Sequence, residues 1–121
     1  MATYKNIVAW QKAIELADLT YAAVRPFPKS ELFGLSAQMR SAATSVASNI
    51  AEGRGRGTDR DYRSFLIRAR GSLFELETQI YIAMRQQLID EETAASLLNR
   101  SAEVGQKLGS LIRYLSKTVK G

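Results

Sequence analysis

The sequence contains no cysteine and no histidine, and these two absences remove most familiar catalytic and metal-binding arrangements. Without cysteine the chain cannot form a disulfide bond or a thiolate metal site. Without histidine it lacks the commonest general base and the commonest ligand for zinc or copper. Serine and threonine are plentiful, but no activating base and no Gly-x-Ser-x-Gly motif accompany them. We therefore expect no enzymatic activity, no cofactor and no metal ion.

Long hydrophobic runs are also missing, since no apolar stretch approaches the roughly 18 residues of a membrane-spanning helix. The start of the chain lacks the charged and apolar regions of a secretory signal peptide. We therefore expect a soluble, cytoplasmic protein with no membrane contact. A length of 121 residues suits one domain with a single core, which we place over residues 1–121.

Apolar residues recur at steps of three and four along most of the chain, which is the spacing of amphipathic helices. The pattern predicts four helices, at about residues 6–24, 30–53, 59–87 and 91–118. No stretch carries a clear strand pattern. Because the connections between the helices are short, the sequence predicts an all-α fold, an antiparallel up-down-up-down four-helix bundle.

Local signals place the ends of these helices. Pro26 and Pro28 should end the first helix, because proline cannot donate the next backbone hydrogen bond and disfavours helix at the preceding residue. Ser30, Thr58 and Asp90 are the expected N-caps of the second, third and fourth helices. The apolar residues expected to face the core from the first helix are Ile7, Trp10, Ile14, Ala17, Tyr21 and Val24.

The second helix is rich in alanine and serine, so it can approach its neighbours more closely than a leucine-rich helix could. We expect Ala43 and Ala47 to lie in such a close contact, and Asn49 to fix the packing register. Gly53, Gly55 and Gly57 should end this helix, at about residue 53.

The third helix is apolar over an unusually broad arc of about 200°, whereas about 100° is enough to cover one core. Ile67, Phe74 and Tyr81 recur at steps of seven and extend the arc on one side. A surface outside the intrachain core should cover them, and we interpret these three residues as an oligomer interface.

Charge is unevenly distributed. The chain has 17 Lys and Arg against 12 Asp and Glu, giving a net charge of +5 and an isoelectric point near 9.7. Residues 53–70 include six arginines and two aspartates, and Lys107, Arg113, Lys117 and Lys120 follow Glu103 with no acid among them. Such segments suit a polyanionic partner. The candidate nucleic-acid-binding residues are Arg54, Arg56, Arg60, Arg63, Arg68, Arg113 and Lys117.

The remaining polar residues on or beside the apolar faces are better explained by structure than by chemistry, since unpaired charge there would be costly. We expect them to form a hydrogen-bonded network inside the protein or across a subunit contact. These residues are Asn49, Glu52, Arg70, Glu75 and Glu77.

Two blocks of sequence carry a family resemblance: Asn49-Ile50-Ala51-Glu52-Gly53, and Gly71-Ser72 followed by Glu75-Leu76-Glu77-Thr78-Gln79. With Trp10-Gln11-Lys12-Ala13 and Phe27-Pro28, they make the chain similar to the bacterial four-helix-bundle proteins encoded in 23S rRNA intervening sequences. That family is related to the accessory variability protein of diversity-generating retroelements. The resemblance covers almost the whole chain.

This resemblance implies a four-helix bundle that assembles as a homopentamer, with a basic surface suspected of binding nucleic acid and no known catalysis. Two functions follow. The chain could bind structured RNA or DNA through its arginines. Alternatively, it could be a scaffold or accessory subunit for a protein partner, because the retroelement relative is a partner of a reverse transcriptase.

Overall fold

The computed structural model describes residues 3–119, and this range contains helices and turns but no strand. The four α-helices are α1 (Val8–Val24), α2 (Leu35–Gly55), α3 (Asp59–Arg85) and α4 (Glu91–Ser116). Two short 3-10 helices, η1 (Tyr4–Asn6) and η2 (Lys29–Glu31), precede α1 and α2. The predicted all-α fold of four helices is confirmed. Lys120, one of the C-terminal cations noted above, lies outside the described residues.

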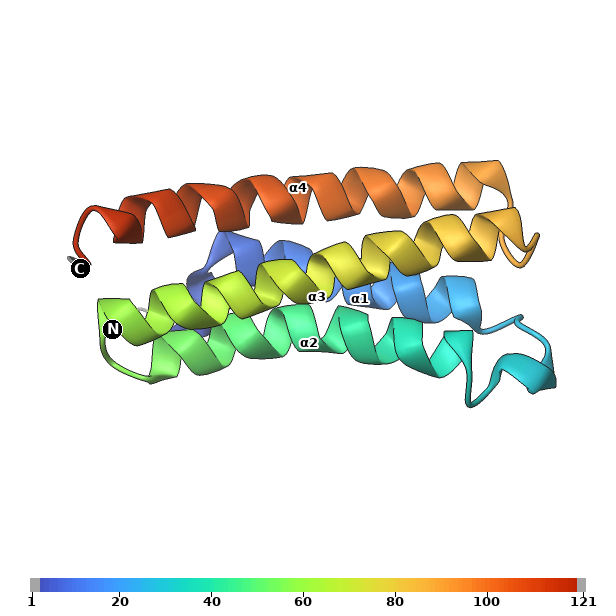
Figure 1. The fold of residues 1–121 in the computed structure, drawn as a ribbon, viewed down its shortest axis with the longest axis horizontal. Helices are drawn as coiled ribbons and strands as arrows, with labels where there is room; N and C mark the ends of the chain where they lie inside the picture. The colour runs from blue at the N-terminus through green and yellow to red at the C-terminus, as the bar shows by residue number, and fades with distance from the viewer. Residues whose placement is uncertain (1–2, 120–121) are drawn as a thin grey trace.

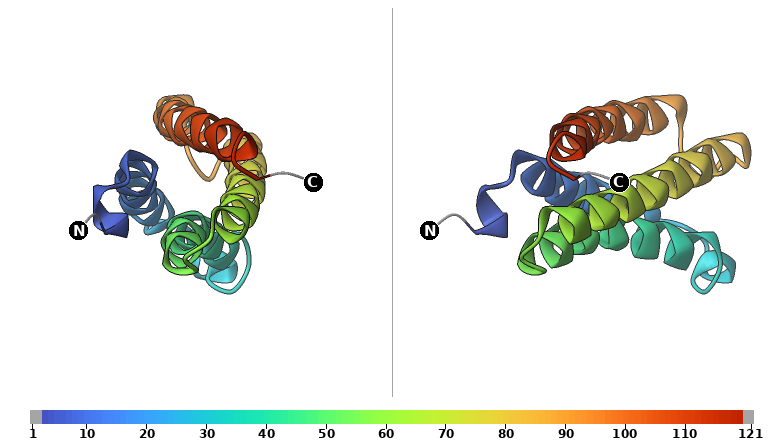
Figure 2. Two further views of the ribbon diagram at one scale, coloured as in Figure 1. Left: turned by 90° about the vertical axis from the view of Figure 1, so that its left-hand side faces the viewer. Right: turned by 60° about the vertical axis from the view of Figure 1, so that its left-hand side comes forward.

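The helices are arranged as a bundle in which consecutive helices run in opposite directions (Figure 1). Each helix packs on two neighbours, with α2 against α1 and α3, and α4 against α3 and α1. The turn between α2 and α3 and the end of α4 lie at one end of the bundle, and the two other connections lie at the opposite end (Figures 1 and 2). Within residues 3–119, none of the helices is long and apolar enough to cross a membrane.

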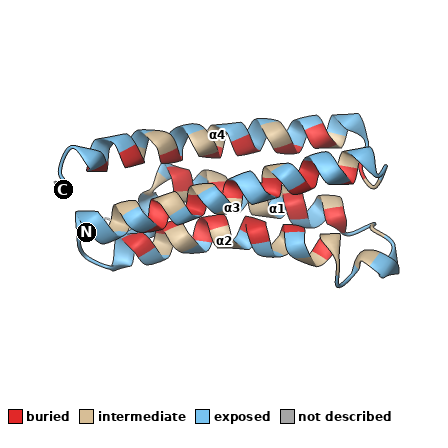
Figure 3. Cartoon of the chain, viewed as in Figure 1, coloured by how far each residue is buried: buried red, intermediate tan, exposed pale blue. Residues whose placement is uncertain are grey.

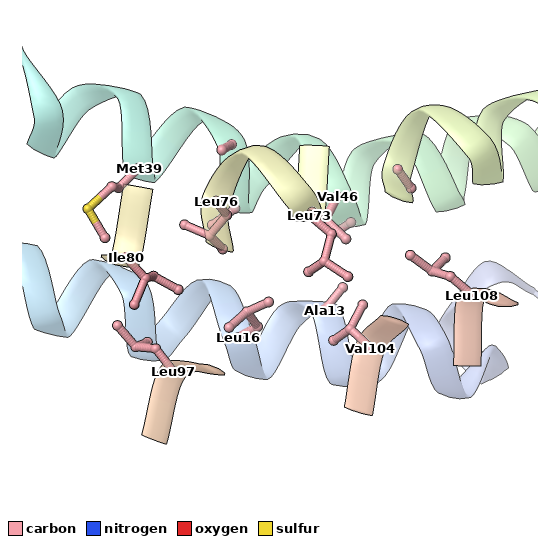
Figure 4. Close-up of a cluster of buried hydrophobic side chains, with 14 of the residues drawn as sticks. Ala13, Leu16, Met39, Val46, Leu73, Leu76, Ile80, Leu97, Val104 and Leu108 are labelled. Atoms are coloured by element: carbon pink, nitrogen blue, oxygen red, sulfur yellow. The ribbon is translucent and has the colours of Figure 1, made fainter. Parts of the chain in front are cut away.

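The core runs along the inside of the bundle as one continuous cluster (Figure 3). Branched and unbranched aliphatic side chains from all four helices meet there, and most of them are fully buried (Figure 4). From α4, the large side chains buried in the core are Leu97, Val104, Leu108, Ile112 and Leu115, while Leu111 is half-buried.

The predicted core face of α1 is only partly correct: Val24 is buried as expected and Ile7, Trp10 and Ala17 pack at the edge of the core, but the centre of the buried face lies elsewhere. Its buried residues are Ala9, Ala13, Leu16, Thr20 and Val24, whereas Ile14 and Tyr21 are 37% and 42% exposed. Alanine at two core positions allows α1 to approach the bundle closely, so the larger apolar residues are displaced to its flank. Thr20 is accommodated in the core because its hydroxyl donates to the Leu16 carbonyl at 2.8 Å.

The predicted start of α2 is wrong, because Ser30 belongs to η2 and α2 begins only at Leu35. Glu31 takes the capping role that was expected of Ser30, because the Leu35 amide at the start of α2 donates to Glu31 Oε1 at 3.1 Å. A carboxylate there satisfies one of the free amides of the first turn and complements the positive end of the helix dipole.

The glycine segment ends α2 as predicted, at Gly55, but Gly53 lies inside the helix. Its role lies in packing, because a Cβ atom at position 53 would come within 2.6 Å of the Phe65 Cβ on α3. The glycine that reverses the chain is Gly57, with φ of +88°, a conformation that other residues adopt rarely. The N-caps of the next two helices are as predicted, since Thr58 Oγ1 accepts from the Asp61 amide and Asp90 Oδ1 from the Thr93 amide.

Candidate nucleic-acid interface

The fold brings the two basic segments of the sequence to the same end of the bundle (Figure 1). Arg54 lies in the last turn of α2 and Arg56 directly follows that helix. Arg60 and Arg63 belong to the first two turns of α3, and the last turns of α4 lie at the same end. We call this surface the basic end and define it as Arg54, Arg56, Arg60, Arg63, Arg68, Arg113 and Lys117.

The turn between α2 and α3 presents its side chains to solvent. Arg54 and Arg56 are exposed, and no atom lies within 4 Å of where a Cβ would be on Gly55 or Gly57. Arg56 closes the helix, donating its backbone amide to the Gly53 carbonyl at 3.2 Å. The backbone of the turn is therefore open to a ligand at both glycines.

Phe65 holds two of the arginines in place. The guanidinium carbon of Arg56 lies 4.8 Å from the centre of the Phe65 ring, and that of Arg68 lies 4.6 Å from it. Both distances are within the range of a cation–π interaction. Arg56 is also paired with Glu52, its Nη2 lying 2.8 Å from Glu52 Oε2. These two cations are consequently ordered on the protein surface.

Hydrogen bonds join the end of α4 to the start of α3. Arg63 Nε donates to Ser116 Oγ at 2.7 Å, and Thr118 Oγ1 donates to Asp59 Oδ2 at 2.8 Å. Arg113 and Lys117 lie in the same part of α4 and are exposed. The cations of α4 and those of the α2–α3 turn therefore lie at the same end of the bundle, although about fifty residues separate them in the sequence.

Tyr62 lies behind this surface and is half-buried. Burial raises the pKa of its phenol above the ordinary value, and the positive charge of Arg54 partly offsets that effect. The hydroxyl is therefore neutral at physiological pH. It can take part in hydrogen bonds at the basic end but adds no negative charge to it.

The polar residues expected to form a network make separate contacts. Asn49 Nδ2 donates to the Ser45 carbonyl at 2.8 Å and to Ser45 Oγ at 3.0 Å, and Ser45 Oγ is 2.8 Å from Ser72 Oγ on α3. Glu77 accepts from Ser101 Oγ of α4 at 2.6 Å.

Glu52 belongs to the basic end through Arg56, as described above. Within residues 3–119, Arg70 and Glu75 form no hydrogen bond or ion pair. One buried polar atom of α3, Gln79 Oε1, also has no partner among the described residues, and the sequence pattern did not single it out.

The three residues interpreted as an oligomer interface are placed unequally. Ile67 is half-buried and packs against the core, whereas Phe74 and Tyr81 are 55% and 51% exposed. Ile82, beside Tyr81, is 44% exposed. The outer side of α3 therefore carries an apolar surface that its own chain leaves open.

Sequence reasoning did not single out Phe65 as a contact for arginine side chains. A signal was present: Phe65 and Arg68 are three residues apart on one helix, a spacing that brings side chains into contact. The contact with Arg56 depends on how closely α2 approaches α3, and the sequence does not specify that distance.

No cluster of acidic residues in the described part of the chain has the geometry of a metal site. The comparisons with known proteins agree with the fold. A crystal structure of a protein of unknown function from the S23 ribosomal protein family of Bacteroides thetaiotaomicron superposes with a TM-score of 0.78. It is 26% identical and the match covers 87% of this chain and 98% of that one.

No curated protein matches the chain. The family model of the 23S rRNA-intervening sequence protein matches residues 5–110, which is nearly the whole sequence. The chain therefore belongs to the 23S rRNA-intervening sequence protein family.

Proposed function

We propose that this chain is a non-enzymatic, homo-oligomeric bundle that binds structured RNA or DNA through its basic end. The observation that carries the proposal is the convergence of two basic segments on one surface, joined by the hydrogen bond from Arg63 to Ser116. Seven cations on one end of a narrow bundle suit the regular negative charge of a nucleic-acid backbone.

The contacts would be made mainly to phosphate groups. Arginine presents a planar set of donors that matches phosphate oxygens, and the exposed Arg54 and the ordered Arg56 supply two such groups at the turn. Phosphate contacts position a protein on nucleic acid but do not read the bases. We expect low sequence preference and strong dependence on salt.

Self-association would multiply this surface. We propose that the exposed apolar side of α3, with Ile67, Phe74 and Tyr81, is covered by another copy of the chain, in the homopentamer that the family resemblance implies. Several basic ends held in one assembly would bind a long polyanion with higher effective affinity than one copy.

Binding is tested with a fluorescent RNA hairpin and a DNA duplex over a range of salt concentrations. The logarithm of affinity should fall against the logarithm of salt with a slope of about 0.9 per phosphate contact on duplex DNA. The double variant Arg113→Glu/Lys117→Glu and the single variant Arg54→Glu should each weaken binding, because the two segments form one surface. Arg85→Glu, at the opposite end of α3, changes the charge by as much as Arg54→Glu; it is the control for that variant and should have little effect.

Absence of binding at about 50 mM salt, where electrostatic contacts are strong, would overturn the proposal. Equal losses in the control variant would overturn the assignment to the basic end. Absence of binding would favour the alternative, a scaffold for a protein partner such as a reverse transcriptase, which pull-down with candidate partners would then address.

Assembly is tested separately, by light scattering coupled to size-exclusion chromatography. Phe74→Glu should dissociate the oligomer without unfolding the chain, since more than half of the side chain is already exposed. Phe33→Glu is the matched control, because Phe33 is 91% exposed in the α1–α2 connection. A monomer at micromolar concentration for the unmodified chain would contradict the proposed assembly.

A further inference from the structure

The end of the bundle opposite the basic end contains a hollow, which is lined by the end of α1, the α1–α2 connection and the start of α2. Its volume is about 460 Å³, which is within the range of about 300 to 1,000 Å³ common for small-molecule sites. Three cations line it: Arg25 follows the last turn of α1, Lys29 lies in η2, and Arg40 lies in the second turn of α2.

No carboxylate lines this hollow, which distinguishes it from the hollows beside the start of α4, where Asp90 and Glu92 contribute. None of the three cations takes part in an ion pair within residues 3–119. Glu31, the acidic residue of η2, has an oxygen already engaged by the Leu35 amide. The negative end of the α1 dipole, about half a charge, offsets only a small part of three positive charges. The hollow therefore favours an anion.

One of the cations is held in position. Arg40 Nη1 donates to Ser36 Oγ at 2.5 Å, and Ser36 is almost fully buried. An oriented guanidinium can offer its remaining N–H groups to a ligand with a smaller loss of side-chain entropy than a free one. Arg25 and Lys29 are exposed and can close on the same anion from the other side.

The remaining wall is apolar. Val24 is buried, Phe27 is half-buried, and Pro28 and Leu32 are exposed beside them. Leu32 leaves 47% of its surface in contact with water, although it lines a recess. A ligand that joins an anionic group to a flat apolar body would use the cations and this wall together.

We propose that this hollow binds a phosphomonoester with a flat ring, of the size of a mononucleotide. A phosphomonoester suits three cations better than a carboxylate, because it carries nearly two negative charges and three acceptor oxygens. The ring would pack on Pro28 and Leu32 while the phosphate is bound by Lys29 and Arg40. The site is separate from the basic end and does not depend on nucleic-acid binding there.

Isothermal titration calorimetry with adenosine 5′-monophosphate tests the proposal. Adenosine, which lacks the phosphate, and ribose 5-phosphate, which lacks the ring, should each bind at least tenfold more weakly. Lys29→Gln and Arg40→Gln should each weaken binding by about tenfold or more, as expected for loss of one charge-assisted contact. Leu32→Ala should weaken binding of the nucleotide but leave ribose 5-phosphate unchanged.

Arg85→Gln removes one positive charge from an exposed position of α3 outside the hollow, and it should leave the affinity unchanged. Circular dichroism of each variant shows whether the fold is intact. If Arg40→Gln fails to fold, the nucleotide affinity of Lys29→Gln alone tests the proposal, since Lys29 is exposed in the α1–α2 connection and its substitution should leave the fold intact. Backbone amide shifts in NMR spectra should map the ligand to η2 and the start of α2.

A free mononucleotide and the 5′ end of a nucleic-acid strand share this chemistry. A 5′-phosphorylated trinucleotide that binds more tightly than its 5′-hydroxyl counterpart and than the mononucleotide would identify a strand end. Preference for the free mononucleotide would identify a soluble ligand. No heat and no shift at a nucleotide concentration of about 1 mM, or equal binding by Lys29→Gln and the unmodified chain, would overturn the proposal.

Discussion

The α2–α3 and α1–α4 interfaces lie in the same bundle but are built differently. Between α2 and α3 the contacts are short: Gly53 lies against Phe65, and the hydroxyls of Ser45 and Ser72 are 2.8 Å apart. Between α1 and α4, long side chains bridge the rim, with Lys12 bound to Glu103 at 2.9 Å and Arg100 to Glu15 at 3.0 Å.

The two interfaces should therefore differ in how strongly a substitution lowers the stability of the fold. Small side chains allow two backbones to approach, so an added methyl group has no space to enter. Long charged side chains at a rim are partly solvated, so losing one leaves a flexible partner that water can accommodate. We therefore expect substitutions between α2 and α3 to affect stability most.

The largest effect is expected for Gly53→Val. Even a Cβ atom would come within 2.6 Å of the Phe65 Cβ and 3.3 Å of the Tyr62 carbonyl oxygen, so the two helices must separate. We expect a loss of about 2 to 3 kcal/mol in the free energy of unfolding, measured by urea denaturation.

Gly55→Ala is the matched control, because Gly55 lies on the same helix as Gly53, outside the left-handed region of φ, with no atom within 4 Å of the added Cβ. That substitution should stabilise the chain by about 0.5 to 1 kcal/mol, since alanine is the better helix former. Equal behaviour of the two variants would refute the explanation of Gly53 by close packing.

Ala43→Leu should be the next most disruptive. Ala43 is 1% exposed on α2, and three extra carbon atoms must displace core side chains, at a cost of about 1 to 3 kcal/mol. Ala47→Leu should cost less, because Ala47 also borders a surface hollow between α1 and α2 that could accept part of the side chain. Thermal unfolding compares both with Ala22→Leu, an exposed position of α1 where little change is expected.

Asn49→Ala should have a smaller effect, of about 0.5 to 1.5 kcal/mol, because it removes hydrogen bonds to Ser45 but leaves no charge unpaired. Stability or assembly should fall without loss of nucleic-acid binding, as expected of a residue that fixes packing. Ser45→Ala in the same background tests the coupling. If the two effects simply add, the amide and the hydroxyl act independently.

The smallest effect belongs to the α1–α4 rim and concerns pH. The hydrogen bond from Lys12, and then its positive charge, hold the pKa of Glu103 below its ordinary value. Because the folded-state pKa is lowered, the stabilising contribution is present above the ordinary pKa of about 4.3 and is lost as pH falls through the folded-state value.

NMR titration of the Glu103 side chain measures this directly. Lys12→Met should return the pKa of Glu103 toward its ordinary value, whereas Lys29→Met, with the same loss of charge at a distant site, should not. A pKa that stays low in Lys12→Met would show that another group holds it.

Much of the fold followed from local sequence patterns. Apolar spacing gave the number and approximate bounds of the helices, and Thr58 and Asp90 capped the helices as expected. The chemistry of an N-cap is local, so a few residues are enough to identify it. Ser30 was misassigned because Glu31 performs the capping role four residues before Leu35, a solution that the simple pattern does not distinguish.

The errors arose where packing distance matters. Spacing alone did not tell which of two adjacent faces of α1 enters the core, and the larger residues were chosen over Ala9 and Ala13. In the same way, the sequence identified the arginines, but it did not show that they lie at one end of the bundle or that Arg56 and Arg68 contact the Phe65 ring. Those features depend on long-range contacts that no local window contains.

The contacts of Phe65 with Arg56 and Arg68 should lower the entropy cost of the proposed binding at the basic end. Two long side chains that already rest on a buried ring have fewer rotamers to give up when a ligand arrives, so more of each contact's free energy remains as affinity. Replacing the ring by an aliphatic side chain would release both guanidinium groups without changing the charge of the surface. The aromatic ring thus makes the surface stiff as well as positive, a property that a count of charges does not reveal.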